Sequence, residues 1–90
     1  MDSLRDVVES QRYSFELAQI ERDKRLSDDV TEAATFLLAR HPEWGARIPG
    51  TQLWLWPVRI RGVEYVIFYS YDDNAVVLQS IMATAGDAVN

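Results

Sequence analysis

Residues 53–82, LWLWPVRIRGVEYVIFYSYDDNAVVLQSIM, decide the fold of this 90-residue chain. They divide into three runs rich in aromatic and β-branched side chains, at residues 53–60, 63–71 and 75–82, and such runs are typical of strands. Arg61-Gly62, between the first two runs, has the length of a tight hairpin and a glycine where positive φ is needed. A cluster of turn-forming residues, Asp72-Asp73-Asn74, separates the second run from the third. The pattern predicts an antiparallel meander of three strands.

Alternation along these strands places apolar side chains on both faces of the predicted sheet. Trp54 and Trp56 share one face of the first strand, and Tyr65 and Tyr69 share one face of the second, where Phe68 lies on the opposite face. The third strand divides its side chains in the same way: Ala75, Val77 and Ile81 on one face, and Val76, Leu78 and Met82 on the other. An antiparallel sheet with helices on one side usually has a polar second face. We therefore expect a cover for each face, from the chain's own helices, a dimer or a partner protein.

The first half of the chain has helical spacing. Between residues 29 and 40, apolar side chains follow the i, i+3, i+4, i+7, i+8 pattern of a buried stripe, at Val30, Ala33, Ala34, Leu37 and Leu38. Pro42 disfavours helical geometry at His41 and ends this helix. Helical spacing also occurs from Leu4 to Phe15 and predicts a first helix. Residues 14–24 are a separate helix, part of the first helix or the start of the second.

The length predicts one domain over residues 1–90. We expect an α+β fold in which N-terminal helices, at about residues 2–41, pack on a small antiparallel β-sheet at about residues 52–83. A chain this short buries a modest share of its surface, so its core is small. Leu37, on the helix stripe, and Phe68, in the central strand, should both be buried.

The composition excludes several classes of protein. Hydrophobic residues make up 48% of the chain and charged residues 26%, which is too apolar for a disordered chain. No stretch has the length of a membrane span, and the N-terminus lacks the apolar run of a signal peptide. A cytoplasmic protein without a membrane partner is therefore expected. The net charge of −5 weakens attraction to phosphate backbones, so direct nucleic-acid binding is not expected.

The residues that usually carry catalysis are sparse. The chain has no cysteine, which excludes disulfides and thiolate sites, and its one histidine, His41, lies at a helix C-terminus, where the helix dipole favours positive charge. Walker and GxGxxG loops are absent, and no motif pairs a serine with the histidine. We expect no catalytic residue, no metal, no cofactor and no enzymatic activity. Arg47, Arg59 and Arg61 could hold a phosphate or carboxylate, although exposed arginines are usually just solvated.

Several short motifs occur together in one order. The run ARHPEWGARIPG at residues 39–50, followed by the strands above, resembles the C-terminal two-thirds of RelE/ParE-type toxins of type II toxin–antitoxin systems. The matches to the family's "hPelG", "pGlr", "rvwPV" and "yliFYrv" segments are residues 41–45, Pro49-Gly50, Trp56-Pro57-Val58 and residues 65–69. The similarity spans about residues 26–82, and the order and spacing of the motifs make it moderately specific.

The chain departs from this family pattern at both ends. The family's last strand and tail often carry an arginine, a histidine and a second arginine, where this chain has Gln79, Met82 and Ala85. The family usually opens with a β-strand, which is not evident in residues 1–11. Cleavage of ribosome-bound mRNA, the activity of the RelE branch, needs acid–base and phosphate-binding groups. The resemblance therefore implies the ParE branch, which poisons DNA gyrase by protein contact.

The leading hypothesis is a ParE-like toxin that acts on a gyrase-type target and is neutralised by a cognate antitoxin. The antitoxin would cover the second apolar face with an amphipathic helix or an added strand. Because Trp, Tyr and Arg dominate interface hot spots, partner contact is expected at Trp54, Trp56, Tyr65 and Tyr69, with Arg59 and Arg61 at the rim. The alternative is a non-toxic, toxin-derived binding module or homodimer, and a RelE-like ribonuclease ranks lowest.

Overall fold

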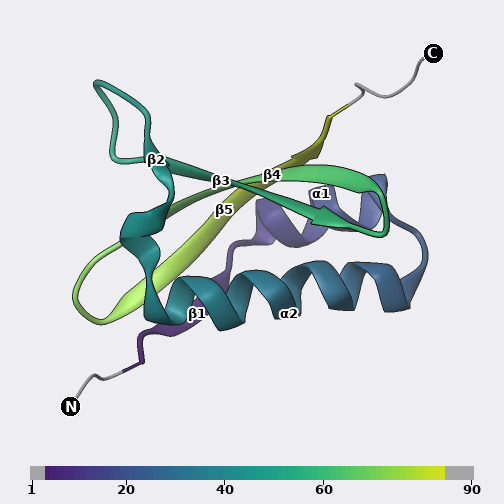
Figure 1. Cartoon of the computed structure of the whole chain (residues 1–90), viewed down its shortest axis with the longest axis horizontal. Coiled ribbons are helices and arrows are strands. Elements are labelled where there is room, and N and C mark those ends of the chain that lie inside the picture. Colours follow the sequence, from purple (N-terminus) through teal and green to yellow (C-terminus); the bar gives the residue numbers. More distant parts are fainter. Residues whose placement is uncertain (1–3, 85–90) are drawn as a thin grey trace.

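The computed structural model describes residues 4–84. Its elements, in chain order, are β1 (Asp6–Glu9), α1 (Gln11–Ile20), α2 (Lys24–Arg40), the 3-10 helix η1 (Pro42–Trp44), β2 (Ala46–Arg47), β3 (Trp54–Ile60), β4 (Val63–Tyr71) and β5 (Ala75–Ala83). One mixed sheet has the strand order β1-β5-β4-β3-β2, in which β1 is parallel to β5 and the other pairs are antiparallel. The α+β fold class and the β3-β4-β5 meander are confirmed (Figure 1). Along the described residues, no helix has the length and apolarity of a membrane span.

The turns of the meander form as their local chemistry predicts. Arg61 and Gly62 join β3 to β4 with φ angles of 53° and 83°, and two positive φ angles match the right-handed twist of a tight hairpin. In the β4–β5 turn, the Asp72 carboxylate accepts hydrogen bonds from the backbone N–H groups of Asn74 and Ala75, at 2.8 and 2.9 Å. These two bonds, Asn74 first, hold the pKa of Asp72 below its ordinary value.

Each of the two α-helices begins at a side-chain cap. Ser10 caps α1 and Asp23 caps α2, and each side chain accepts a hydrogen bond from a backbone N–H of the first turn, which satisfies one otherwise unpaired donor. The structure resolves the alternatives for residues 14–24, because α1 is a separate helix. The second helix begins before its predicted start at Asp29 and ends before Pro42 as predicted.

Strand β1 corrects the prediction that the first residues are helical. Residues 6–9 pair in parallel with residues 75–78 of β5. At the two ends of this pairing, Asp6 N–H donates to the Asn74 carbonyl and Ser10 N–H donates to the Leu78 carbonyl. The pairing partner is distant in the chain, and such tertiary context overrides a weak local pattern. An N-terminal strand, which was not evident in the sequence, is therefore present.

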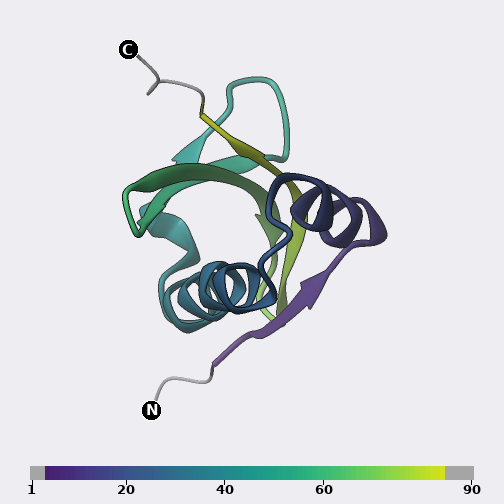
Figure 2. The same ribbon diagram turned by 90° about the vertical axis from the view of Figure 1, so that its right-hand side faces the viewer.

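The sheet curls around α2, so that its concave face encloses the core (Figure 2). The second helix lies against this face, and α1 packs against β5. The buried apolar residues of the core come from both helices and all three long strands: Tyr13, Leu17, Val30, Ala34, Leu38, Val58, Tyr65, Ile67, Tyr69, Val76, Leu78 and Ile81. The face of β3, β4 and β5 that points away from α2 is called the outer face below.

Buried tyrosines tie the sheet to the helical half of the chain. The hydroxyl of Tyr65 donates to the Glu21 carboxylate at 3.2 Å, and that of Tyr69 donates to the Pro42 carbonyl. The hydroxyl of Tyr13, on α1, makes a hydrogen bond with a threonine hydroxyl of α2. Burial raises the pKa of all three phenols, that of Tyr69 to about 12, because a phenolate is poorly solvated in the core.

Two predictions of burial are wrong. Leu37 and Phe68 are both half-buried. The buried line of α2 runs through Val30, Ala34 and Leu38, which leaves Leu37 at its margin. Phe68 alternates with the buried residues of β4 and therefore lies on the outer face.

Candidate functional site

A bulge in β5 changes which side chains face outward. Phe68 of β4 lies opposite Ser80, but the next residue, Tyr69, lies opposite Leu78. Gln79 is therefore the extra residue of a β-bulge, a feature that re-aims side chains and is common beside functional sites. As a result, Gln79 and Ser80 both line the outer face, where each contributes to a pocket with Phe68.

The bulge also overturns the predicted faces of β5. Strict alternation places Ile81 on the same face as Val77, but Ile81 is 3% exposed and belongs to the core with Val76 and Leu78. Beyond the bulge the alternation is reset by one residue. Met82 consequently lies on the outer face, opposite Val66, and is 50% exposed.

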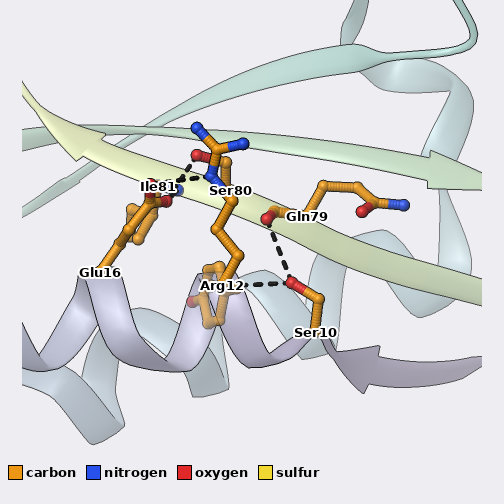
Figure 3. Close-up of polar contacts among 7 residues, drawn as sticks. Ser10, Arg12, Glu16, Gln79, Ser80 and Ile81 are labelled. Atoms are coloured by element: carbon orange, nitrogen blue, oxygen red, sulfur yellow. Dashed lines mark hydrogen bonds and ion pairs between the residues drawn. The ribbon is translucent and has the colours of Figure 1, made fainter.

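Side chains of α1 complete the edge of β5. Strand β1 pairs with β5 only as far as Leu78, so the backbone groups beyond it need other partners. Ser10 Oγ donates to the Gln79 carbonyl at 3.1 Å, and Glu16 Oε1 accepts from the Ile81 N–H at 3.1 Å. Figure 3 shows both side chains reaching from the α1 side to the strand. The helix thus continues, with side chains, the edge pairing that β1 begins with its backbone.

Glu16 is the centre of this cluster. Its carboxylate also accepts the Ser80 hydroxyl at 2.5 Å and Arg12 Nε at 3.0 Å. The Ser80 hydrogen bond is the main cause that lowers the pKa of Glu16, because it stabilises the charged form. The carboxylate is therefore ionised at neutral pH and joins α1, the bulge and Arg12.

A pocket of about 390 Å³ opens on the outer face beside the cluster. Its lining residues, which define the outer-face pocket, are Ser10, Arg12, Leu53, Phe68, Gln79 and Ser80. Leu53 and Phe68 give it an apolar side, and the other residues supply polar groups. Arg12 is the one charged side chain that lines this pocket in the part of the chain that is described. An apolar cavity with a few convergent polar groups is the usual form of a small-ligand site.

A second, larger concavity of about 980 Å³ lies between β1, α1 and α2, and is called the helical groove below. Its apolar lining includes Leu4 and Phe36, which are 57% and 62% exposed. Strand β1 is one of the two edge strands of the sheet. The backbone N–H groups of Asp6 and Ser10 donate to the backbone carbonyls of Asn74 and Leu78. Because backbone N–H groups alternate in direction along a strand, those of Val7 and Glu9 point to the free edge. Val7 and Glu9 also line the groove. The groove therefore combines apolar surface with an edge strand.

The structure places the predicted aromatic contact residues on the concave face. Tyr65 and Tyr69 are 1% and 0% exposed, which corrects the expectation that a partner can reach their side chains, because α2 covers this face. Trp54 and Trp56 are half-buried and pack against the same core. Partner contact by the two tryptophans stays a prediction.

The two predicted rim residues lie at the surface. Arg59 and Arg61 are exposed, and Arg61 forms an ion pair at 3.4 Å with Asp29 of α2; their contact with a partner also stays a prediction. Among the positions that depart from the family pattern, Gln79 lines the outer-face pocket. Ala85 lies outside the described residues.

Sequence reasoning missed the contribution of α1 to the pocket. Arg12 and Glu16 have the i, i+4 spacing of a helical ion pair, and that local signal was present. No local signal connects Glu16 to Ser80, because 64 positions separate them in the chain. Within residues 4–84, no group of three or more histidine or acidic side chains could hold a metal ion.

No protein-family model matches the sequence, and no curated protein sequence matches it. Among solved structures, a chain of the toxin–antitoxin complex RelBE2 from Mycobacterium tuberculosis is similar with a TM-score of 0.70 and 20% identity, over 94% of this chain and 97% of that chain. YafQ from E. coli strain BL21(DE3) is similar with a TM-score of 0.44 and 16% identity, over 90% of this chain and 94% of that chain. The RelBE2 match confirms the fold that the resemblance to RelE/ParE-type toxins implies, without distinguishing the ParE branch.

The match to RelBE2 also corrects the expectation that the chain is not an enzyme. RelBE2 carries the name of the RelE branch, for which the resemblance implies mRNA cleavage. The ParE branch was favoured because Gln79, Met82 and Ala85 replace an arginine, a histidine and a second arginine of the family pattern. The structure instead places Gln79 in a pocket whose polar groups come partly from α1.

Proposed function

We propose that this chain is a RelE-type toxin of a type II toxin–antitoxin pair, that it acts on RNA at the outer-face pocket, and that an antitoxin neutralises it in the helical groove. The observation that carries the proposal is the fold shared with RelBE2 over 94% of the chain at a TM-score of 0.70. That structure is a toxin–antitoxin complex. The two concave sites lie on different parts of the molecule, which suits one protein that meets both a target and a partner.

The chemistry of the outer-face pocket suits a nucleotide of RNA. Phe68 is half-buried on the outer face, so part of its ring is accessible, and aromatic rings are the usual platform for an unstacked base. The Gln79 amide donates to the Ser70 hydroxyl at 3.0 Å, which orients it beside the ring. The net charge of −5 does not favour free RNA, but the resemblance implies RNA that the ribosome presents. Tight binding of free RNA is then not required.

The helical groove suits an extended antitoxin segment. The free-edge N–H groups of Val7 and Glu9 can pair with an added strand, and apolar side chains such as Phe36 flank it. Arg5 meets the last turn of α2, since its N–H donates to the Ala39 carbonyl, and Arg40 lines the groove nearby. Glu9 lies at the other end of β1. Because the Arg5 guanidinium already donates to the Asp72 carbonyl at 2.7 Å, we expect the segment to carry an acidic side chain near Arg40 and a basic one near Glu9.

Induced expression in E. coli tests the toxin role directly. We expect growth arrest, with cleavage of mRNA detected by primer extension. Phe68→Ala should abolish both effects, because it removes the aromatic surface of the pocket. Val66→Ala, a truncation on the same face of β4 but outside the pocket, is the matched control and should retain them. Circular dichroism melts of both variants check that each still folds.

The same experiment separates the rival functions. Growth arrest without RNA cleavage, together with inhibition of gyrase supercoiling by the purified protein, would replace RNA with the gyrase-type target of the ParE branch. A well-folded protein that neither arrests growth nor cleaves RNA would point to the non-toxic binding module or homodimer.

Co-expression with the product of the neighbouring reading frame tests the groove. Val7→Pro removes a free-edge N–H but no hydrogen bond to β5, so the variant should remain toxic and escape neutralisation. Phe36→Ser should weaken neutralisation by removing apolar surface. Phe15→Ser changes a similarly exposed phenylalanine of α1 that does not line the groove, and it should be neutralised like the unmodified chain. If Val7→Pro is neutralised equally well, the antitoxin does not add a strand to β1.

A further inference from the structure

Arg12 differs from an ordinary surface arginine because its ion-pair partner is fixed. An exposed i, i+4 pair usually holds neither side chain strongly. Here the partner, Glu16, also accepts hydrogen bonds from the Ser80 hydroxyl and the Ile81 N–H of β5. The carboxylate is therefore anchored on the sheet, and through Nε it fixes Arg12 relative to the outer-face pocket (Figure 3).

The ion pair leaves the two terminal nitrogens of the Arg12 guanidinium free of Glu16. Only Nε of Arg12 takes part in the bond to Glu16, and the side chain is 75% exposed, against 27% for Glu16. The two terminal nitrogens of an arginine can bind a phosphate as a fork. Because Glu16 already holds the side chain, these nitrogens present their N–H groups at the rim of the pocket, and binding a phosphate costs little additional side-chain conformational entropy.

The two serine hydroxyls at the pocket are already engaged. The Ser10 hydroxyl donates to the Gln79 carbonyl, and the Ser80 hydroxyl donates to Glu16. A hydroxyl has a single proton to donate. Neither serine can therefore donate to an anion without breaking a bond that ties α1 to β5. Of the remaining donors that line the pocket, the Gln79 amide is neutral and Arg12 carries a positive charge, which makes Arg12 the anion-binding group.

We propose that Arg12 binds the phosphate of a nucleotide whose base lies against Phe68, and that Glu16 is the positioning residue that holds Arg12 for this contact. The inference deepens the proposed function and rests on it, because it assigns the phosphate contact of the RNA site to helix α1. It also gives the acidic Glu16 a supporting role in an anion site, where its charge alone would be unfavourable.

The negative charge of Glu16 should weaken anion binding, whereas its hold on Arg12 should strengthen it. Glu16→Gln distinguishes these two effects. A glutamine oxygen can still accept from Ser80 and Ile81, but its amide nitrogen cannot accept from Arg12. The variant should keep the strand contact and the fold while it releases Arg12. If Glu16 acted only through its charge, its neutralisation would strengthen anion binding. If Glu16 instead positions Arg12, the variant should bind AMP about threefold more weakly, which corresponds to about 0.7 kcal/mol at 1.4 kcal/mol per tenfold.

The probes are AMP and adenosine, which differ only by the phosphate. In titrations followed by two-dimensional NMR, AMP should shift the amide signals of Gln79, Ser80 and Ile81 more strongly and at lower concentration than adenosine. Arg12→Gln should weaken AMP binding by about tenfold or more and leave adenosine unchanged, because a charge-assisted hydrogen bond contributes about 1.5–3 kcal/mol. Arg22→Gln, which neutralises an exposed arginine between α1 and α2, is the matched control and should bind AMP like the unmodified chain.

These titrations measure binding directly and do not depend on whether the chain is toxic. Equal binding of AMP and adenosine, an unchanged AMP affinity in Arg12→Gln, or tighter AMP binding in Glu16→Gln would overturn the inference. If the chain arrests growth and cleaves RNA but fails these titrations, the proposed function stands and the role of α1 falls. If it binds AMP as described but is not toxic, the phosphate contact stands and the toxin assignment falls.

Discussion

The two faces of β4 share the same backbone ladder but have different surroundings. On the concave face, Tyr65 and Tyr69 are buried beneath the helical layer. On the outer face, the residues between and beside them, Val66 and Phe68, remain half-buried. Both faces share the same backbone hydrogen bonds, so the difference lies in side-chain burial. The free energy of folding therefore comes mainly from the covered face. The outer face is thereby free to bind, and substitutions should separate the two roles.

The largest effect should come from the core beneath the concave face. Leu38→Ala should lower the free energy of unfolding by about 2–5 kcal/mol, as the truncation of a buried leucine leaves a cavity, and Leu38 is 0% exposed. Leu37→Ala, the adjacent truncation at the half-buried margin, should cost clearly less. Urea unfolding followed by circular dichroism measures both. Equal losses would show that α2 is rotated relative to the sheet.

Gly45 should be the next most sensitive position. A Cβ atom there would collide with the Tyr69 hydroxyl group and would lie 2.7 Å from the Leu55 carbonyl oxygen. Because the φ of Gly45 is −74°, the need for glycine is steric. Gly45→Ala should cost about 1–3 kcal/mol or more.

Gly50→Ala is the control for this steric argument. Gly50 has a φ of 78° and nothing within 4 Å of an added Cβ, so its substitution introduces backbone strain alone, of about 1–2 kcal/mol. Combined with Tyr69→Phe, which removes the hydroxyl group, Gly45→Ala should cost less than it does alone. Additive losses in the double variant would contradict the collision.

Alkaline pH should weaken the concave face selectively. Burial raises the pKa of Tyr13, Tyr65 and Tyr69 in the folded protein, that of Tyr69 to about 12. A folded-state pKa above the unfolded value of about 10 means that this stabilisation is fully present below pH 10 and is lost as the pH rises toward 12. Urea unfolding between pH 8 and 11.5 should show the decline, and Tyr69→Phe should make it shallower. An unchanged slope in that variant would exclude Tyr69 as a source.

Local chemistry predicted much of the fold. The hairpin at Arg61-Gly62, the turn at residues 72–74 and the end of α2 before Pro42 all depend on neighbouring residues, and the sequence indicated each one. Strand β1 depends on pairing with β5, which is distant in the chain. Its four residues have no strong strand pattern of their own, so the local helical spacing was misleading.

The site was less predictable than the fold, for a similar reason. One extra residue, Gln79, resets the alternation of β5, and nothing in its side chain marks a bulge. The contact between Glu16 and Ser80 exists only after α1 docks on the strand. Aromatic residues were predicted at an interface from their type, but Tyr65 and Tyr69 occupy the covered face. Residue type indicated a surface suited to protein contact, but the topology decides which face of the sheet is exposed.

The smallest effect on stability should come from Met82 on the outer face. Met82→Ser should change the free energy of unfolding by no more than about 0.5 kcal/mol, as is usual for exposed positions, because Met82 is 50% exposed. Ile81→Ser, one residue earlier, places an unpaired hydroxyl in the core and should cost several-fold more. The comparison tests the bulge, since strict alternation would place Ile81 on the face of Val77, which is half-buried. If urea unfolding shows that the Met82 change is the more costly, β5 has no bulge, and the outer-face pocket that Gln79 and Ser80 share is not formed.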